Sequence, residues 1–349
     1  MAALAVRTVL SAPLTREGNK IQSKAILAVS ILSAVGAAWM IVSFMVFKAL
    51  RSFRHQLILG LAISDFCMAA NFCLSTGLNV SGRMIGDPAQ DKVCSFNGFM
   101  TQVFVIQTDY WVLTIAACTF LILANYRKQS MWIQDHRIYL WCIPWVFSSL
   151  WAGLGLGLAG YDDIGAWCWF TSDKVRLLVN FLPRWVIIAI ILCIYTRLYF
   201  IIYRAHSRFS ELDAEVAADI GTGSGALEGT LRSSTELLDS GGSKPATVGE
   251  GASVGQGENV DVARGSVAKP NSELKRIAGK MMIYPLVYML IWVIPTSIRI
   301  YQSVSGQSAP LAVATVDKAC IVVQGFADAI VYGVNESSLA AWRDRFSRR

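Results

Sequence analysis

Long apolar stretches separated by short polar ones make up most of this chain. Each apolar stretch is bounded by polar or charged residues and is long enough to cross a bilayer as a helix, which takes about 20 mainly apolar residues. There are seven such stretches, at residues 25–47, 57–78, 94–125, 138–160, 177–203, 281–302 and 313–335. The pattern predicts an all-α protein, a bundle of seven transmembrane helices.

Composition and charge fit a membrane protein. The 349 residues are 54% hydrophobic and 16% charged, with a mean hydropathy of +0.47, which is too apolar for an ordinary soluble domain. The formal net charge is +7, but the basic residues lie at the ends of apolar stretches and form no nucleic-acid-binding motif. Two short loops between stretches carry Lys48, Arg51 and Arg54, and Arg127, Lys128 and Arg137.

These basic loops predict the orientation, because short loops rich in Lys and Arg stay on the cytoplasmic side. The N-terminus is therefore expected outside, although basic residues in the N-terminal tail favour the opposite orientation. We expect a multi-pass plasma-membrane protein with an extracellular tail over residues 1–24. The helices then occupy residues 25–204 and 276–335, and a cytoplasmic tail follows over residues 336–349.

The segment between the fifth and sixth stretches, residues 205–275, changes abruptly to a Gly- and Ser-rich composition with few aromatics. Such a segment buries too little apolar surface to offset its ordering entropy, so a disordered third cytoplasmic loop is predicted. Ser233, Ser234 and Ser266 follow nearby arginines and are candidate phosphorylation sites. An unmodified flexible tether is the alternative.

The C-terminal tail carries apolar residues at helical spacing among arginines, namely Leu339, Trp342 and Phe346. This pattern predicts a short amphipathic helix on the inner leaflet, with its basic side toward anionic lipid. An unstructured basic tail is the alternative.

Two of the eight cysteines are predicted to form a disulfide bond. Six fall inside predicted helices, where cysteine behaves as a small apolar residue. Cys94, at the outer end of the third helix, and Cys168, in the second outer loop, face the oxidising side together. Their bond would hold the loop across the top of the helix. Asn79 begins a glycosylation pattern near the end of the second helix.

The residues give no sign of an enzyme. All three histidines, His55, His136 and His206, fall in predicted cytoplasmic loops, so an intramembrane zinc hydrolase would lack ligands. There is no nucleophile elbow, phosphate loop or zinc-protease motif. We expect no metal site and no cofactor.

Three carboxylates interrupt the apolar stretches, and a rise of about 1.5 Å per residue places them at similar depths. Asp65, Asp109 and Asp328 all fall on the cytoplasmic side of mid-membrane, with Asn335 nearby. Three ionised carboxylates in one dry layer would repel, so the arrangement suggests a polar switch layer that a sodium ion could occupy. Neutral acids hydrogen-bonded to backbone and water are the alternative.

Three basic residues lie nearer the outer face: Arg184, Arg299 and Lys318. If they face one cavity, they favour an anionic ligand such as a phosphate or carboxylate. The alternative is snorkelling, in which long basic side chains reach interfacial water without any ligand. Trp167 and Trp169 could roof the cavity or form an interfacial aromatic belt.

The sixth stretch contains Pro285 and Pro295. Proline removes a backbone hydrogen bond and allows a helix to bend, so both are natural hinge points. Trp292 lies about one turn before Pro295, where a bulky ring could respond to helix tilt. Ordinary packing of a large aromatic is the alternative.

Several motifs together resemble the G-protein-coupled receptor superfamily, in particular the cyclic-AMP-receptor-like branch of slime moulds and fungi. They are LILGLAISDF, DYWVLTIAACTFLIL, CWF around Cys168, MMIYPLVYMLIWVIP and QGFADAIVYGVNE. The resemblance covers residues 25–204 and 276–337. The rhodopsin-like Asp-Arg-Tyr and Asn-Pro-x-x-Tyr motifs are absent, which argues against the rhodopsin-like class.

The resemblance implies a receptor that binds a small molecule from outside and drives nucleotide exchange on a heterotrimeric G protein through an outward movement of helix six. A basic cytoplasmic rim is the expected G-protein contact, formed by Arg127, Lys128, Lys275, Arg276 and Lys280.

Two other protein classes remain open, a retinal-binding seven-helix light sensor or pump and a membrane solute carrier. For retinal, Lys318 is too near the outer end to form a mid-membrane Schiff base. For a carrier, the chain lacks an internal repeat.

Overall fold

A computed structural model describes residues 15–124, 126–201, 203–204, 269–335 and 338–347 of the chain. Contacts divide the chain into two units, residues 1–196 with 274–349, and residues 197–273. The first unit contains the helical bundle and the site residues described below. The predicted phosphorylation sites Ser233, Ser234 and Ser266 lie outside the described residues.

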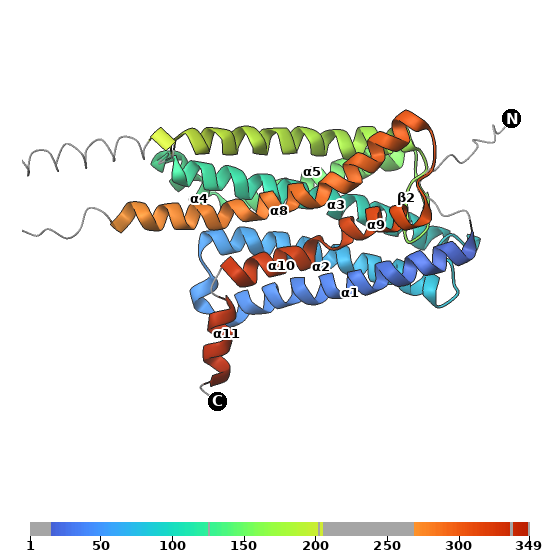
Figure 1. The fold of residues 1–349 in the computed structure, drawn as a ribbon, viewed down its shortest axis with the longest axis horizontal. Helices are drawn as coiled ribbons and strands as arrows, with labels where there is room; N and C mark the ends of the chain where they lie inside the picture. Colours follow the sequence, from blue (N-terminus) through green and yellow to red (C-terminus); the bar gives the residue numbers. More distant parts are fainter. Residues whose placement is uncertain (1–14, 125, 202, 205–268, 336–337, 348–349) are drawn as a thin grey trace, which may run out of the picture. The chain divides into compact units, whose positions relative to one another are not determined.

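Helices form almost all of the described structure (Figure 1). They are α1 (Arg16–Val46), α2 (Phe53–Val80), α3 (Asp91–Leu123), α4 (Arg127–Asp135), α5 (Arg137–Leu158), α6 (Asp173–Arg176), α8 (Lys269–Ser305), α9 (Leu311–Val322), α10 (Gln324–Asn335) and α11 (Ser338–Ser347), with the 3-10 turns η1 (Lys48–Leu50) and η2 (Pro88–Gln90). The short helix α6 continues through a π-helical turn, η3 (Leu177–Phe181), into a helical run that ends at Ile201. We call this run the Asp173–Ile201 helix.

The seven-helix bundle predicted from hydropathy is confirmed. Among the described residues, six helices are long and apolar enough to cross a membrane: α1, α2, α3, α5, the Asp173–Ile201 helix and α8. The seventh stretch is divided at Val323 into α9 and α10, which have 12 residues each. The long helix α1 packs against α2, α9 and α10, while α3 packs against α2 and α5.

Several element boundaries differ from the sequence prediction. Helix α1 begins at Arg16, inside the predicted tail 1–24, because the Thr15 hydroxyl caps it by accepting a hydrogen bond from the Gly18 N–H at 3.1 Å. Helix α8 begins at Lys269, so the end of the predicted disordered loop 205–275 is helical. The rest of that loop lies outside the described residues. The short helix α4 was not predicted.

The predicted disulfide between Cys94 and Cys168 is present, with an S–S distance of 1.95 Å. It joins the first turn of α3 to a small antiparallel hairpin of β1 (Tyr161–Asp163) and β2 (Cys168–Phe170). The side-chain oxygen of Asn97 accepts a hydrogen bond from the Cys168 N–H at 3.0 Å. The outer loop is therefore attached to α3 by both a covalent bond and a hydrogen bond.

The predicted glycosylation at Asn79 is inconsistent with the structure. The side chain is fully buried, and its amide donates to the Ser23 hydroxyl at 3.1 Å and to the Gly165 carbonyl at 2.9 Å. Its oxygen accepts from the Ile85 N–H at 2.8 Å. Asn79 instead joins α1, α2 and the outer hairpin, and a glycan could not be attached without breaking these bonds.

Helix α11 forms at the predicted place and leaves the bundle at a steep angle (Figure 1). Its Trp342 indole donates to the Ser43 hydroxyl at 2.8 Å and packs edge-to-face on Phe47, with ring centroids 5.1 Å apart. Leu339 and Phe346 are 56% and 67% exposed. The helix is thus held to the end of α1 by one face and leaves apolar side chains uncovered.

Close packing between α2 and α3 depends on a glycine. A Cβ added at Gly60 would lie 2.3 Å from the ring of Trp111, which is completely buried. At Gly77, in the same helix, an added Cβ would meet nothing within 4 Å. Gly60 therefore has no room for a larger side chain, whereas Gly77 in the same helix does.

We expect Gly60→Ala to lower the thermal unfolding midpoint of the purified protein, because overpacking a buried contact typically costs about 1–3 kcal/mol. Gly77→Ala is the matched control. It should be neutral or slightly stabilising, since Ala is favoured over Gly inside helices by roughly 0.5–1 kcal/mol. Equal unfolding midpoints for the two variants would contradict the close approach of α2 and α3.

Candidate functional site

A buried ion pair joins α3 to the Asp173–Ile201 helix. The Arg184 Nε lies 3.1 Å from both carboxylate oxygens of Asp109, and its Nη2 lies 2.9 Å from Oδ2. Nη2 also donates to the Val105 carbonyl at 3.3 Å. Both charged side chains are completely buried. Charges removed from water require close pairing and hydrogen bonds, and this geometry supplies both.

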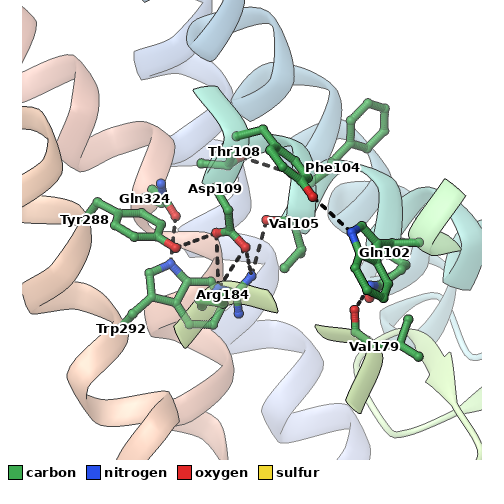
Figure 2. Close-up of polar contacts among 12 residues, drawn as sticks. Gln102, Phe104, Val105, Thr108, Asp109, Val179, Arg184, Tyr288, Trp292 and Gln324 are labelled. Carbon is green, nitrogen blue, oxygen red and sulfur yellow. Dashed lines mark hydrogen bonds and ion pairs between the residues drawn. The ribbon is translucent and has the colours of Figure 1, made fainter. Parts of the chain in front are cut away.

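Helices α8 and α10 complete a buried polar cluster around the pair (Figure 2). The Tyr288 hydroxyl donates to Asp109 Oδ1 at 2.5 Å, and the ring of Trp292 lies 3.3 Å from the Arg184 Cζ. The Trp292 indole in turn donates to Gln324 Oε1 at 3.2 Å. We call Asp109, Arg184, Tyr288, Trp292 and Gln324 the buried polar cluster. It connects four helices through one carboxylate and one guanidinium.

A second set of contacts connects the outer hairpin to the same region (Figure 2). The Trp169 indole donates to Gln102 Oε1 at 2.9 Å, and Gln102 Nε2 donates to the Val179 carbonyl at 3.4 Å. Val179 belongs to the π-helical turn η3, five residues before Arg184. The disulfide-linked loop is therefore bonded to α3 directly and to the Asp173–Ile201 helix through Gln102.

The predicted layer of three carboxylates is not present as such. Asp109 pairs with Arg184 and Tyr288, whereas Asp65 interacts with Asp328 and Thr108. Residue spacing indicates depth along a helix but not the direction in which a side chain points. Asp109 faces the Asp173–Ile201 helix and α8, so the predicted layer reduces to the pair of Asp65 and Asp328.

The division of the seventh helix places Gln324 in the cluster. Gln324 is the first residue of α10, and the Phe326 N–H donates to the Ser33 hydroxyl of α1 at 3.1 Å. Gly325 lets α10 approach its neighbours, because a Cβ there would lie 2.7 Å from the Ser33 oxygen and 2.9 Å from the Asp65 Cβ. The break thus turns Gln324 toward Trp292.

Lys318 does not face a common cavity with Arg184. Its ammonium donates to Gln22 Oε1 and to the Ile164 carbonyl, both at 2.7 Å, and the side chain is buried. It therefore connects α9 to the start of α1 and to the turn of the outer hairpin. The snorkelling alternative is also wrong for Lys318, because its buried side chain does not reach the surface.

Arg299 likewise has its own partners. Its Nη2 lies 3.1 Å from Asp317 Oδ2, and its Nη1 donates to Gln302 Oε1 at 2.7 Å. The three predicted cations thus divide among separate acceptors. Arg299 also lines a pocket at the surface.

That pocket has a volume of about 290 Å³ and lies between the outer ends of the Asp173–Ile201 helix and α8. Its lining residues are Asp173, Lys174, Arg176, Leu177, Phe181, Arg299, Gln302, Ser303 and Gly306. We call it the outer pocket. Phe181 connects the outer pocket to the buried polar cluster. The Cζ atom of Arg299 lies 5.7 Å from the Phe181 ring centroid, and the Cζ atom of Arg184 lies 5.8 Å from it.

The predicted ligand residues Trp167 and Trp169 are not part of the outer pocket, although the Cζ atom of Arg176, which lines it, lies 5.1 Å from the Trp169 ring centroid. Both are completely buried and neither lines the outer pocket. Trp167 packs on Phe72 with ring centroids 4.5 Å apart, and Trp169 binds Gln102. The disulfide-linked hairpin holds both rings against the helices, so they neither roof this pocket nor form an interfacial belt.

At the opposite end of the bundle, Lys280 and Asn335 bind each other. The Lys280 ammonium donates to the Asn335 carbonyl, and the Asn335 amide donates to the Lys280 carbonyl at 3.3 Å. This reciprocal pair ties α8 to the end of α10. Asn335 was predicted beside the carboxylate layer and Lys280 on the basic rim, so the structure joins residues from two separate predictions.

The rest of the predicted basic rim is described only in part. Lys128 is exposed in α4. The side chains of Arg127, Lys275 and Arg276 lie outside the described residues.

No group of three His, Cys, Asp or Glu side chains could hold a metal ion among the residues that the structure describes.

Sequence reasoning missed Tyr288, Gln324, Arg176 and Phe181. Gln324 carried a usable signal, since a polar residue beside a glycine interrupts an apolar stretch. Tyr288 lies one helical turn before Trp292, so it could have been placed on the same face. Phe181 gave no signal, because one more apolar residue in an apolar helix is unremarkable.

Two family models match this chain. Residues 19–209 match the model described as "G protein-coupled glucose receptor regulating Gpa2", and residues 269–343 match the C-terminal model of the same description. An ascaroside receptor of Arthrobotrys oligospora is 40% identical over 380 aligned positions, covering 97% of this chain and 94% of the relative.

Two more distant proteins agree with this placement. A cyclic AMP receptor-like protein of Dictyostelium discoideum is 29% identical over 170 positions, covering 48% of this chain and 42% of the relative. The crystal structure of squid rhodopsin superposes with a TM-score of 0.61 at 15% identity, covering 96% of this chain and 86% of that one. At such low identity, the likeness to rhodopsin concerns the fold alone.

The ion pair can be tested by a double-mutant cycle. Asp109→Asn or Arg184→Gln alone should strongly destabilise the protein, because leaving one buried charge unpaired costs about 3–5 kcal/mol. The double variant should lose clearly less than the sum of the two single losses. Thermal unfolding of the four purified proteins measures this, and simple additivity would rule out direct coupling.

Proposed function

The chain belongs to the family of G protein-coupled receptors that the two models describe, and on this premise we propose that it binds an extracellular small molecule and activates a heterotrimeric G protein by a movement of α8. It is a multi-pass membrane receptor of the fungal and slime-mould type, and it is not an enzyme. The proposal locates it in the plasma membrane, where an outside ligand and a cytoplasmic G protein are both within reach.

The observation that carries the proposal is the position of α8 in the buried polar cluster. Tyr288 and Trp292 are both on α8, and they bind groups on α3, the Asp173–Ile201 helix and α10. A displacement of α8 must break or rearrange these contacts. A ligand that favours the rearranged cluster would shift the population toward the displaced state, because it can act only through its different affinity for the two states.

The outer pocket offers a route from ligand to cluster. Phe181 lines this pocket and lies within cation–π range of both Arg299 and Arg184. A ligand that moves the Phe181 ring would therefore change the environment of the ion pair without touching it. The π-helical turn that carries Phe181 supports this role, since such turns are often found at functional sites.

At the cytoplasmic end, the reciprocal pair of Lys280 and Asn335 opposes a movement of α8. Pro285 and Pro295, both inside α8, allow the helix to bend on either side of the cluster. We propose that activation releases Lys280 from Asn335 and frees it for the G protein. Lys128, Arg127, Lys275 and Arg276 remain the proposed basic contacts for the same partner.

The relatives suggest the class of ligand. The family model names a glucose receptor, and the relative of 40% identity is an ascaroside receptor. Sugar-type ligands need hydrogen-bonding side chains, and the outer pocket provides Gln302 and Ser303 beside charged groups. We propose a sugar-containing ligand with an anionic part.

Lipid contact at the C-terminal helix also remains a proposal. Leu339 and Phe346 are exposed on α11, and Trp342 anchors that helix to α1. An amphipathic helix held in this way could lie on the inner leaflet with its arginines toward anionic headgroups.

The retinal alternative is disfavoured by Lys318. Its amine is bound to Gln22 and the Ile164 carbonyl, and Asp109 is paired with Arg184 instead. A Schiff base would need that lysine free in the middle of the bundle. No observation favours a solute carrier.

The proposed function is tested with purified receptor in lipid nanodiscs, mixed with heterotrimeric G proteins and a panel of sugars and ascarosides. We expect at least one compound to accelerate guanine-nucleotide exchange, measured by binding of a labelled GTP analogue. The effect should require the receptor and rise with ligand concentration. If no compound and no G protein gives receptor-dependent exchange, the proposed function is wrong.

Lys280→Met should raise exchange in the absence of ligand about tenfold or more, because hydrogen bonds from charged groups contribute about 1.5–3 kcal/mol and each 1.4 kcal/mol is about tenfold. Lys48→Met, at an exposed lysine of η1, is the matched control and should change nothing. A fall in exchange for Lys280→Met would show that this lysine serves only as a G-protein contact.

A further inference from the structure

Two buried arginines meet at the outer pocket. Arg176 comes from α6 and Arg299 from the outer end of α8, and they are 0% and 6% exposed. Their guanidinium groups are close enough to interact electrostatically, and like charges repel. Both line the pocket together with the exposed Lys174. Bringing these cations together in a largely buried place is unfavourable unless negative charge offsets them.

The carboxylates of the described residues offset only part of this charge. Asp173 Oδ1 lies 3.3 Å from Arg176 Nη1, and Asp317 Oδ2 lies 3.1 Å from Arg299 Nη2. Asp317 also interacts electrostatically with Lys318 and Arg176. The group is made up of four cations, Lys174, Arg176, Arg299 and Lys318, and three carboxylates, Asp173, Asp317 and Asp163, the last of which also interacts with Lys318. It therefore keeps an excess of positive charge.

One hydrogen-bond donor at the pocket is also unused. The Arg299 Nε is buried and has no hydrogen-bond partner among the described residues, although Nη1 and Nη2 of the same group are both bonded. A buried donor without an acceptor is costly, and a guanidinium edge suits the planar oxygens of a carboxylate. The missing acceptor and the excess charge point to the same chemistry.

The pocket also has apolar lining residues. Phe181 and Leu177 line it, and Phe181 is completely buried. A volume of about 290 Å³ leaves room for a carboxylate joined to a ring or a short chain. An anionic group at the arginines would place the rest of the ligand against Phe181, next to the ion pair.

We infer that the outer pocket is the binding subsite for a carboxylate group of the ligand, held by Arg176 and Arg299. The inference rests on the proposed receptor function and specifies the chemistry of its ligand. It replaces Arg184 and Lys318 as the predicted anion-binding residues, since neither of them lines the outer pocket.

The probe is benzoate, with benzamide as its uncharged counterpart of the same shape. Binding is measured by saturation-transfer NMR on the full-length receptor in phosphatidylcholine nanodiscs, without G protein. Benzoate should bind saturably and at least about tenfold more tightly than benzamide. Arg299→Gln and Arg176→Gln should each weaken benzoate binding about tenfold or more, as expected for charge-assisted hydrogen bonds.

Arg83→Gln is the matched control, because Arg83 is exposed in the first outer loop and does not line the pocket. It should leave benzoate binding unchanged. Two milder variants cover the case in which a buried arginine cannot be replaced without unfolding. Lys174→Gln removes an exposed pocket charge, and Arg299→Lys keeps the charge but loses the planar fork, so each should weaken binding severalfold.

Equal binding of benzoate and benzamide would overturn the inference, and so would unchanged benzoate affinity in both milder variants. The outcome is separable from that of the receptor test, because no G protein is present. Charge-dependent benzoate binding without nucleotide exchange by any compound would contradict the receptor function and leave the anion subsite in place. If sugars drive exchange but benzoate binds no more tightly than benzamide, the receptor function stands and the anion subsite is wrong.

Discussion

The buried pairing of Asp109 with Arg184 is the constraint on which the rest of the bundle depends. In a low-dielectric interior, either charge alone would be strongly unfavourable, so α3 and the Asp173–Ile201 helix must remain in register. Tyr288 and the Val105 carbonyl form further hydrogen bonds with the pair. The position of α8 is consequently tied to the same two charges.

Two further contacts lie at opposite ends of the bundle, and both belong to the proposed activation. On the outer side, Phe181 separates the ion pair from the outer pocket and is in range of an arginine on each side. On the cytoplasmic side, Lys280 holds α8 to the end of α10. The disulfide and Asn79 hold the hairpin at the outer end, whereas the proposed function requires a movement at the cytoplasmic end of α8.

Membership in a family of G protein-coupled receptors agrees with this layout but does not determine it. The likeness to squid rhodopsin extends over nearly the whole chain, yet it concerns only the path of the helices. The layout rests instead on particular features of this chain: a guanidinium stacked on Trp292, a seventh helix divided at Val323, and arginines that line the outer pocket.

The sequence by itself determined the apolar stretches that form the helical bundle and the Cys94–Cys168 bond. Hydropathy measures length, and the oxidising side of the membrane selects that cysteine pair, so these follow without a fold. Spacing multiplied by helical rise placed Asp109 on the cytoplasmic side and Arg184 near the outer face, but the two side chains are in direct contact, so it did not give their relative depth. Only the tertiary structure decided that Asp109 faces Arg184 instead of Asp65, that Asn79 is buried, and that Gln324 meets Trp292. The rotation of each helix about its axis is set by packing against several neighbours at once, and residues distant in sequence supply those neighbours.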